Sequence, residues 1–261
     1  MEIINIDKDS EIVLDTQAKE IEININKCRV IISDISSCKK KIVVNDGELD
    51  YCYIKKNQLD NEFNLTLNGG NANVRVIDIL DNTTKDSYNL NLDRVNSEME
   101  FSVATIAKNN VDKEYKIRSN NNASSEIKLD CFGISQDTSL IKYDVTSFIK
   151  KGAKRARVNQ NSKILLFDKE SRGINNPILE IEENDVKANH GSSIGMIDEE
   201  TLFYLTSRGI KESEARNLVS LGKINYIIDE VKKEKIKEEL LKEVIERVWG
   251  SERLSSRLSF F

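Results

Sequence analysis

The residue best suited to act as a metal ligand or as an acid or base is His190, the only histidine among 261 residues. It lies in the run NHGSSIG at positions 189–195, just before a helix-like segment that begins DEETLFYL. A neutral imidazole is a common ligand for transition metals and titrates near physiological pH. One imidazole cannot form a metal site unless partners converge on it. His190 is therefore either a ligand in a shared site or a hydrogen-bonded residue in a turn.

The four cysteines, Cys28, Cys38, Cys52 and Cys131, are widely spaced and include no CxxC pair. Their spacing matches no zinc or haem signature. Because Cys28, Cys38 and Cys52 fall within strand-like segments, we expect free thiols that pack as small hydrophobic side chains. Metal or redox chemistry is the alternative.

Composition and charge exclude several classes of function. The formal net charge is only -5, and basic and acidic residues are mixed along the chain, so we expect no nucleic-acid partner and no anionic-membrane surface. The N-terminal residues MEIINIDKDSEIVL are acidic where a signal peptide would be basic, and no apolar stretch approaches the roughly 20 residues that span a bilayer. These features predict a soluble, cytoplasmic protein.

The elements that must position His190 are short strands. Up to about Met196 the chain alternates apolar and polar residues in segments such as KEIEININ, EFNLTLN, NANVRVID, SYNLNLD and KILLFD. Clusters of Asn, Asp and Gly separate them, as at positions 68–71, and Pro177 is expected at the start of a strand. The pattern predicts a mainly β fold and leaves a sandwich, a barrel and a β-solenoid open.

Beyond Met196 the apolar period becomes helical. Asp198 can cap a helix from Glu199 to Arg208 that Gly209 closes, and a second helix is expected from Glu212 to Leu221, closed by Gly222. Apolar spacing between Asn225 and Val248 predicts one long helix or two packed pieces. The last residues, SERLSSRLSFF, have no clear period and are expected to be frayed or bound to a partner.

The segment from Lys163 to Leu221 resembles the closing motif of the SufB/SufD family of iron–sulfur cluster assembly proteins. Members of that family show an LLL strand, a P-x-LEI strand, a DVK-x-x-HGAT-x-G turn, an LDEEQLFYL-x-SRG helix and an EEAR helix. This chain matches at Leu165, Leu166, Pro177, Leu179, Glu180, Ile181, Asp185, Val186, Lys187, His190, Gly191, Gly195, Asp198, Glu199, Glu200, Leu202, Phe203, Tyr204, Leu205, Ser207, Arg208, Gly209, Glu214, Ala215 and Arg216.

The resemblance implies a right-handed parallel β-helix core at residues 1–196, followed by a small C-terminal helical domain at residues 197–261. It implies a scaffold subunit rather than an enzyme, which pairs through its β-helix with a SufB/SufD-type paralogue or with a second copy of itself. The ATPase SufC would dock on the helical domain. The implied docking residues are Leu202, Phe203, Tyr204, Leu205, Ser207, Arg208, Gly209, Glu214, Ala215 and Arg216.

The resemblance also implies a role for His190 as a ligand, at the interface, of a transient iron–sulfur cluster shared with a partner chain, with no cofactor bound stably. Ala188 stands where SufD-type members usually have cysteine, and Gly191 stands where SufB-type members usually have glutamate, so the segment resembles SufD more. Because strand-like segments begin at the first residues, we expect a short form that lacks the N-terminal helical region of larger members.

Two other function classes stay open. One is a structural or regulatory SufD-like homodimer that binds the ATPase without ligating a cluster. The other is a β-helix that acts on carbohydrate, against which the low aromatic content of 6% and the lack of a clustered acidic pair argue. The chain has no GxxxxGK[ST] motif, so nucleotide hydrolysis would belong to a partner.

Overall fold

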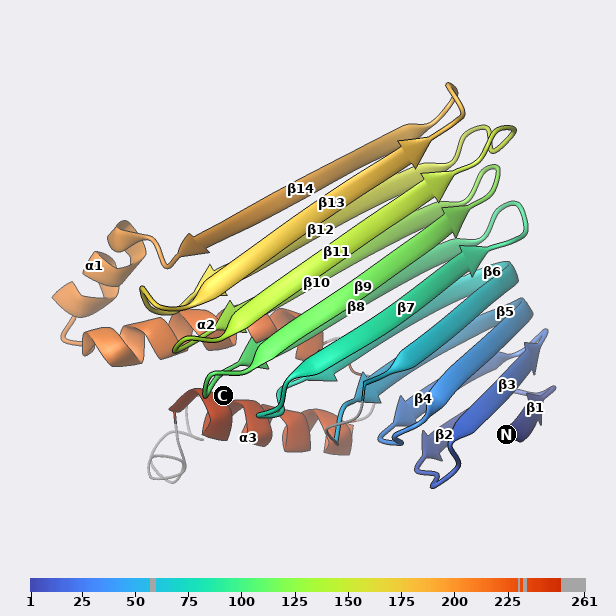
Figure 1. Cartoon of the computed structure of the whole chain (residues 1–261). Coiled ribbons are helices and arrows are strands. Elements are labelled where there is room, and N and C mark those ends of the chain that lie inside the picture. The colour runs from blue at the N-terminus through green and yellow to red at the C-terminus, as the bar shows by residue number, and fades with distance from the viewer. Residues whose placement is uncertain (57–59, 230, 232–233, 250–261) are drawn as a thin grey trace.

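The structure, a computed structural model, describes residues 1–56, 60–229, 231 and 234–249. Its strands stack in two facing layers, and helices lie along one side (Figure 1). The first strands are β1 (Glu2–Ile6), β2 (Ser10–Leu14), β3 (Glu20–Asn26), β4 (Arg29–Asp34), β5 (Lys39–Ile54) and β6 (Glu62–Asp78). One layer continues with β8 (Glu98–Ala107), β10 (Glu126–Ser135), β12 (Arg157–Leu166) and β14 (Lys187–Met196). The opposite layer continues with β7 (Thr84–Leu92), β9 (Asp112–Asn121), β11 (Leu140–Ile149) and β13 (Arg172–Ile181).

The strands form a parallel β-helix, which confirms the expected fold class. The order β13-β11-β9-β7-β6-β8-β10-β12-β14 shows that the chain alternates between the layers, and the pairings along this path are parallel. Residue 98 pairs with 126, 126 with 157, and 157 with 187, so one coil takes about 30 residues. The coils are alike in register but not in sequence, which is why no strict repeat is visible.

Alternating side chains fill the interior of the β-helix, which we call the lumen. In β11 every second residue is buried, and successive coils stack these residues in columns such as Tyr88, Ile117 and Val145. Phe63 stacks in register with Tyr88 of the next coil and contacts Tyr51 of the opposite layer, with ring centroids 5.9 and 5.3 Å apart. Burial of this apolar surface, at about 25 cal/mol per Å², is the main stabilisation of the coils.

A glycine corner replaces an expected turn. The segments EFNLTLN and NANVRVID were expected as separate strands, but both lie in β6, which bends at Gly69 and Gly70. Both glycines have positive φ, 91° and 87°, a conformation that other residues rarely adopt. The ladder to β5 continues on both sides of the bend, since Asn68 pairs with Asn45 and Gly70 with Gly47.

The C-terminal region forms α1 (Glu199–Ser207), α2 (Glu212–Ile228) and α3 (Glu234–Trp249). The first helix agrees with expectation: Asp198 accepts a 2.7 Å bond from the Thr201 amide, and Gly209 follows with φ 86°. The expected end of the second helix at Leu221 was wrong, because α2 continues through Gly222 to Ile228. The roughly 1 kcal/mol cost of a helical glycine is smaller than the gain from burying apolar residues beyond it, such as Ile224.

Helices α2 and α3 cover the outer face of the layer that contains β8 and β10, which we call the helix-bearing layer. Outward residues Ile77, Ile106 and Phe132 share a buried core with Ile224 and Val244. Among the described residues, no helix is both long and apolar enough to cross a membrane. The unpatterned end at residues 251–261 lies outside the described residues.

Pro177 lies in the middle of β13 rather than at a strand start, so that expectation was wrong. In the described sheet β13 is an edge strand that pairs with β11. Proline is tolerated in edge strands because its missing N–H need not remove a ladder bond.

Candidate functional site

His190 lies in β14 and continues a column of inward-facing side chains. It pairs in register with Gln160 of β12, which pairs with Leu129 of β10. Leu129 and Gln160 are buried, whereas His190 is exposed, because no described strand stacks on β14. The imidazole therefore stands at the open end of the lumen, in a strand rather than in a turn.

Side-chain amides join the two layers around His190. The Gln160 Nε2 group donates to Ser147 Oγ at 2.8 Å and to the Ile178 carbonyl at 3.1 Å. In the last coil, Asn175 Nδ2 donates to the carbonyls of Ser162 and Ser193 at 3.1 and 3.3 Å. These bonds cross from one layer to the other and hold together the strands next to His190 at the open end.

Sequence reasoning did not single out Gln160 or Asn175 as site residues. The signal was present, because each is a polar residue at an inward position of an alternating strand. Buried polar side chains at such positions need hydrogen-bond partners, and here the partners come from the opposite layer.

The open end of the β-helix presents unpaired strand edges and apolar side chains. Strands β13 and β14 end the described sheet order, so each has a free edge. The exposed apolar residues at this end are Ile174, Ile178, Ile181, Ile194 and Met196. An exposed apolar patch beside unpaired backbone groups is typical of a surface that pairs with another chain.

The described residues do not assemble a complete metal site around His190. No group of three His, Cys, Asp or Glu side chains in this part of the chain could hold a metal ion. His190 can thus supply one ligand, and any others would have to come from outside the described residues or from another chain.

The cysteines lie in the protein interior as free thiols. Cys52 and Cys131 are in strands, but Cys28 and Cys38 lie in the bends before β4 and β5, where strands were expected. Burial raises the pKa of both Cys52 and Cys131 to about 12, so these thiols are poor nucleophiles and poor metal ligands at neutral pH.

The structure divides the residues expected to dock a partner into exposed and buried groups. Phe203 and Tyr204 on α1 are 73% and 53% exposed, while Leu202 and Ala215 are buried in the core under the helices. Leu205, Glu214 and Arg216 are half-buried, and Ser207, Arg208 and Gly209 are exposed. The exposed members are the ones that a partner can touch.

Both arginines in this set, Arg208 and Arg216, have structural contacts. Arg208 lies over the Tyr204 ring, 4.3 Å from its centroid, and holds that ring in place. Arg216 pairs with Glu212 and donates to the Phe167 carbonyl at 3.2 Å, which ties α2 to the end of β12.

A groove lies between α1 and α2. Its floor is apolar, from Leu205, Leu218 and Val219, and its rim carries the carboxylates of Asp198 and Glu200. Tyr204 and Thr201 complete the lining. The groove can take an apolar side chain flanked by a cation.

Comparisons with known proteins all point to iron–sulfur cluster assembly. A family model described as "SUF system FeS cluster assembly, SufBD core domain" matches residues 23–223. The iron–sulfur cluster assembly protein SufD of Bacillus subtilis (strain 168) is 38% identical over 115 residues, which cover 44% of this chain and 26% of that protein. SufD of Escherichia coli (strain K12) is 34% identical over 89 residues, or 34% of this chain and 21% of that protein.

A more distant relative covers more of the chain. SufD of Plasmodium berghei (strain Anka) is 25% identical over 181 residues, which cover 68% of this chain and 13% of that protein. The matched part is thus about a quarter or less of the length of each of these relatives.

Proposed function

The chain belongs to the SufBD core family of the SUF system for iron–sulfur cluster assembly, and from this premise we propose that it is a non-enzymatic scaffold subunit of that system. In this role it holds a nascent cluster at its open end and passes the cluster on as cargo. The observation that carries the proposal is the position of His190, which continues the interior column but is exposed.

The open end is the proposed pairing surface. Two free strand edges offer backbone N–H and C=O groups to the edges of another β-helix. The apolar residues beside them, Ile178 and Ile194 among them, favour contact with a similarly apolar end. A SufB/SufD-type paralogue and a second copy of this chain both meet that description.

In the pair, His190 contributes one nitrogen ligand to a cluster shared between the chains. Iron–sulfur clusters are held mainly by thiolates, with imidazole in some sites, so the partner supplies the thiolates or carboxylates. Gln160 and Asn175 hold the strands that position the imidazole.

The ATPase of the system is proposed to dock on the exposed face of α1 and on the groove between α1 and α2. Phe203 and Tyr204 offer exposed aromatic surface there, the kind of side chain that supplies much of the binding energy in protein interfaces.

The cluster role is tested with His190→Ala in the chain co-expressed with the ATPase and a SufB-type chain. We expect unchanged melting temperature and ATPase content, with less iron per complex. Ser192→Ala is the matched control, since Ser192 is also exposed and lies at the next inward position of β14. Equal iron in His190→Ala and wild-type complexes would rule out the ligand role.

A second candidate function is a structural or regulatory SufD-like homodimer that binds the ATPase without ligating a cluster. It requires no cluster ligands from the described residues, in which no group of three His, Cys, Asp or Glu side chains could hold a metal ion. It predicts that His190→Ala lowers the melting temperature of the dimer and leaves iron in the complex unchanged.

A further inference from the structure

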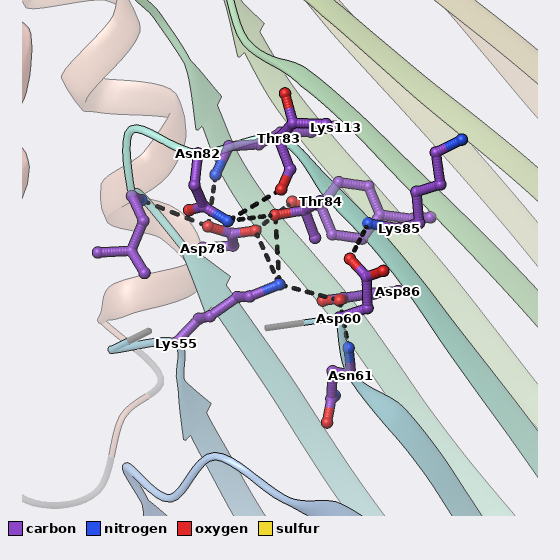
Figure 2. Close-up of polar contacts among 12 residues, drawn as sticks. Lys55, Asp60, Asn61, Asp78, Asn82, Thr83, Thr84, Lys85, Asp86 and Lys113 are labelled. Atoms are coloured by element: carbon purple, nitrogen blue, oxygen red, sulfur yellow. Dashed lines mark hydrogen bonds and ion pairs between the residues drawn. The ribbon is translucent and has the colours of Figure 1, made fainter. Parts of the chain in front are cut away.

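Four fully buried charged side chains meet in the lumen, in the part of the β-helix far from His190. Lys55 Nζ lies 2.9 Å from Asp86 Oδ1 and 4.0 Å from Asp78 Oδ2, and Lys113 Nζ pairs with Asp78 Oδ1. All four side chains are 0% exposed or nearly so. Figure 2 shows Lys55 between Asp78 and Asp86. We call Lys55, Asp78, Asp86 and Lys113 the charge cluster.

The charge cluster joins the two layers of the β-helix. Asp78 ends β6, and Lys55 follows the last residue of β5, both in the helix-bearing layer. Asp86 and Lys113 come from β7 and β9 in the opposite layer. Tyr115 of β9 also donates to Asp78 Oδ2 at 2.8 Å. The two layers thus meet here through polar contacts, which Thr105 and Thr84, the residues in register with Asp78 and Lys113, extend through hydrogen bonds to Tyr115 and Lys55.

The same strand ends carry the helices on their other face. Successive residues of a strand point to opposite faces, so the neighbours of Lys55 and Asp78 point outward. These neighbours, Ile54, Ile77 and Ile79, belong to the core that packs against α2 and α3. Lys56 forms an ion pair with Glu243 of α3. The helices and the charge cluster are therefore separated by the thickness of one strand layer.

Exposure to water costs the charge cluster less free energy than it costs an apolar contact, because the buried charges regain hydration. Desolvation is the largest effect on two of its members, raising the pKa of Asp86 and lowering the pKa of Lys113. Water that enters recovers the solvation of both charges, whereas water between apolar side chains recovers nothing.

We propose that the charge cluster is a conformational device, a polar seam between the layers whose opening to water is controlled by the packing of α2 and α3. When the helices are seated, Ile54, Ile77 and Ile79 are held and the seam is closed. When the helices shift, the strand ends beneath them move and water reaches the lysines. The inference concerns the chain by itself and does not require the docking proposal.

The test is acetylation of lysine amines by an N-hydroxysuccinimide ester on the folded full chain, followed by mass spectrometry. Val244→Ala weakens the packing of α3 on the helix-bearing layer, because Val244 is fully buried in the core under the helices. Val145→Ala is the matched control, since Val145 is equally buried but lies in β11, away from that core. Lys85, an exposed residue, reports the reactivity of the reagent.

We expect Val244→Ala to accelerate acetylation of Lys55 and Lys113 about tenfold or more over wild type, while Val145→Ala leaves both rates within about twofold and Lys85 reacts equally in all three proteins. If Val244→Ala does not fold, Ile245→Val removes less volume from the same core. Equal acceleration in both variants, or none in the α3 variant, overturns the proposal.

Discussion

Gln160 in β12 donates through Nε2 to Ser147 Oγ in β11, at 2.8 Å, and so joins the two layers one coil below His190. Replacing Gln160 with leucine removes this bond and the bond to the Ile178 carbonyl, and takes one donor away from the fully buried Ser147 hydroxyl. We expect the free energy of unfolding, measured with urea, to fall by about 1–3 kcal/mol. Asn159→Ala on the same strand, where the side chain is exposed, should change it by less than about 0.5 kcal/mol. An equal effect of the two substitutions would contradict this role.

A second prediction concerns docking of the ATPase. Replacing Phe203 and Tyr204 together with alanine should weaken binding at least about tenfold, or 1.4 kcal/mol, without a change in melting temperature, because both side chains are exposed. Calorimetric titration measures the affinity. Tyr226→Ala on α2, where the ring is 71% exposed, is the control that should bind normally.

Substitutions test docking better than truncation after Met196. Removing the helices would expose Ile77, Ile106 and Phe132, which they now bury, and the shortened chain would lose binding for reasons of folding alone. Wild-type affinity in the Phe203 and Tyr204 double variant would place the docking surface elsewhere.

The cysteines should behave as packing residues. Cys131→Ala should lower the free energy of unfolding by about 1–3 kcal/mol, because the side chain is buried in the lumen. Native Cys52 and Cys131 should resist alkylation at neutral pH and react after denaturation, since burial raises the pKa of each thiol to about 12. Loss of cluster assembly in Cys131→Ala with unchanged stability would instead point to a chemical role.

The charge cluster predicts how stability depends on pH. The pKa of Asp86 is raised from 3.8 by burial, so the folded state binds this proton more readily, and the Asp86 contribution to the free energy of unfolding grows as pH falls through its folded pKa. The pKa of Lys113 is lowered from 10.5 by burial, so its contribution grows as pH rises from its folded pKa toward 10.5. Urea unfolding across pH should show the acid-side gain disappear in Asp86→Asn and the alkaline-side gain disappear in Lys113→Met.

Glu183 provides a control of opposite sign. Backbone amides of Asp185 and Gly152 lower its pKa from 4.5, so its stabilising contribution is present above 4.5 and is lost as pH falls through its folded pKa. Glu183→Gln should flatten this acid-side loss.

An Asp86→Asn protein with the same acid-side slope as wild type would show that Asp86 does not titrate as described.

Much of the fold could be predicted from local pattern. Alternation located most strands, and the cap at Asp198 with Gly209 located α1 to within a residue. Alternation cannot say which strands pair, so the parallel β-helix followed from the family resemblance. The errors have a shared cause: at Gly70, Gly222 and Pro177, pairing or packing in the whole fold outweighed a local preference.

The candidate site was predictable only in part. A unique histidine in a family motif identified His190, but its place at the end of the lumen depends on the register of β12 and β14. Lys55, Asp78, Asp86 and Lys113 are spread over nearly sixty positions, and nothing in their spacing shows that they meet. The signal was a charged residue at an inward position, which becomes informative once the inward positions are known.

The stacking of like coils also limits how the length of this chain can change. Adding one residue within β12 ahead of Gln160 would turn every later side chain of that strand to the opposite face and place Gln160 outside the lumen, away from Ser147. Adding residues to the turns, or adding one whole coil, leaves the inward set intact. Natural variants of the β-helix should therefore differ in length by loop residues or by multiples of a coil, with the imidazole still carried by the final strand.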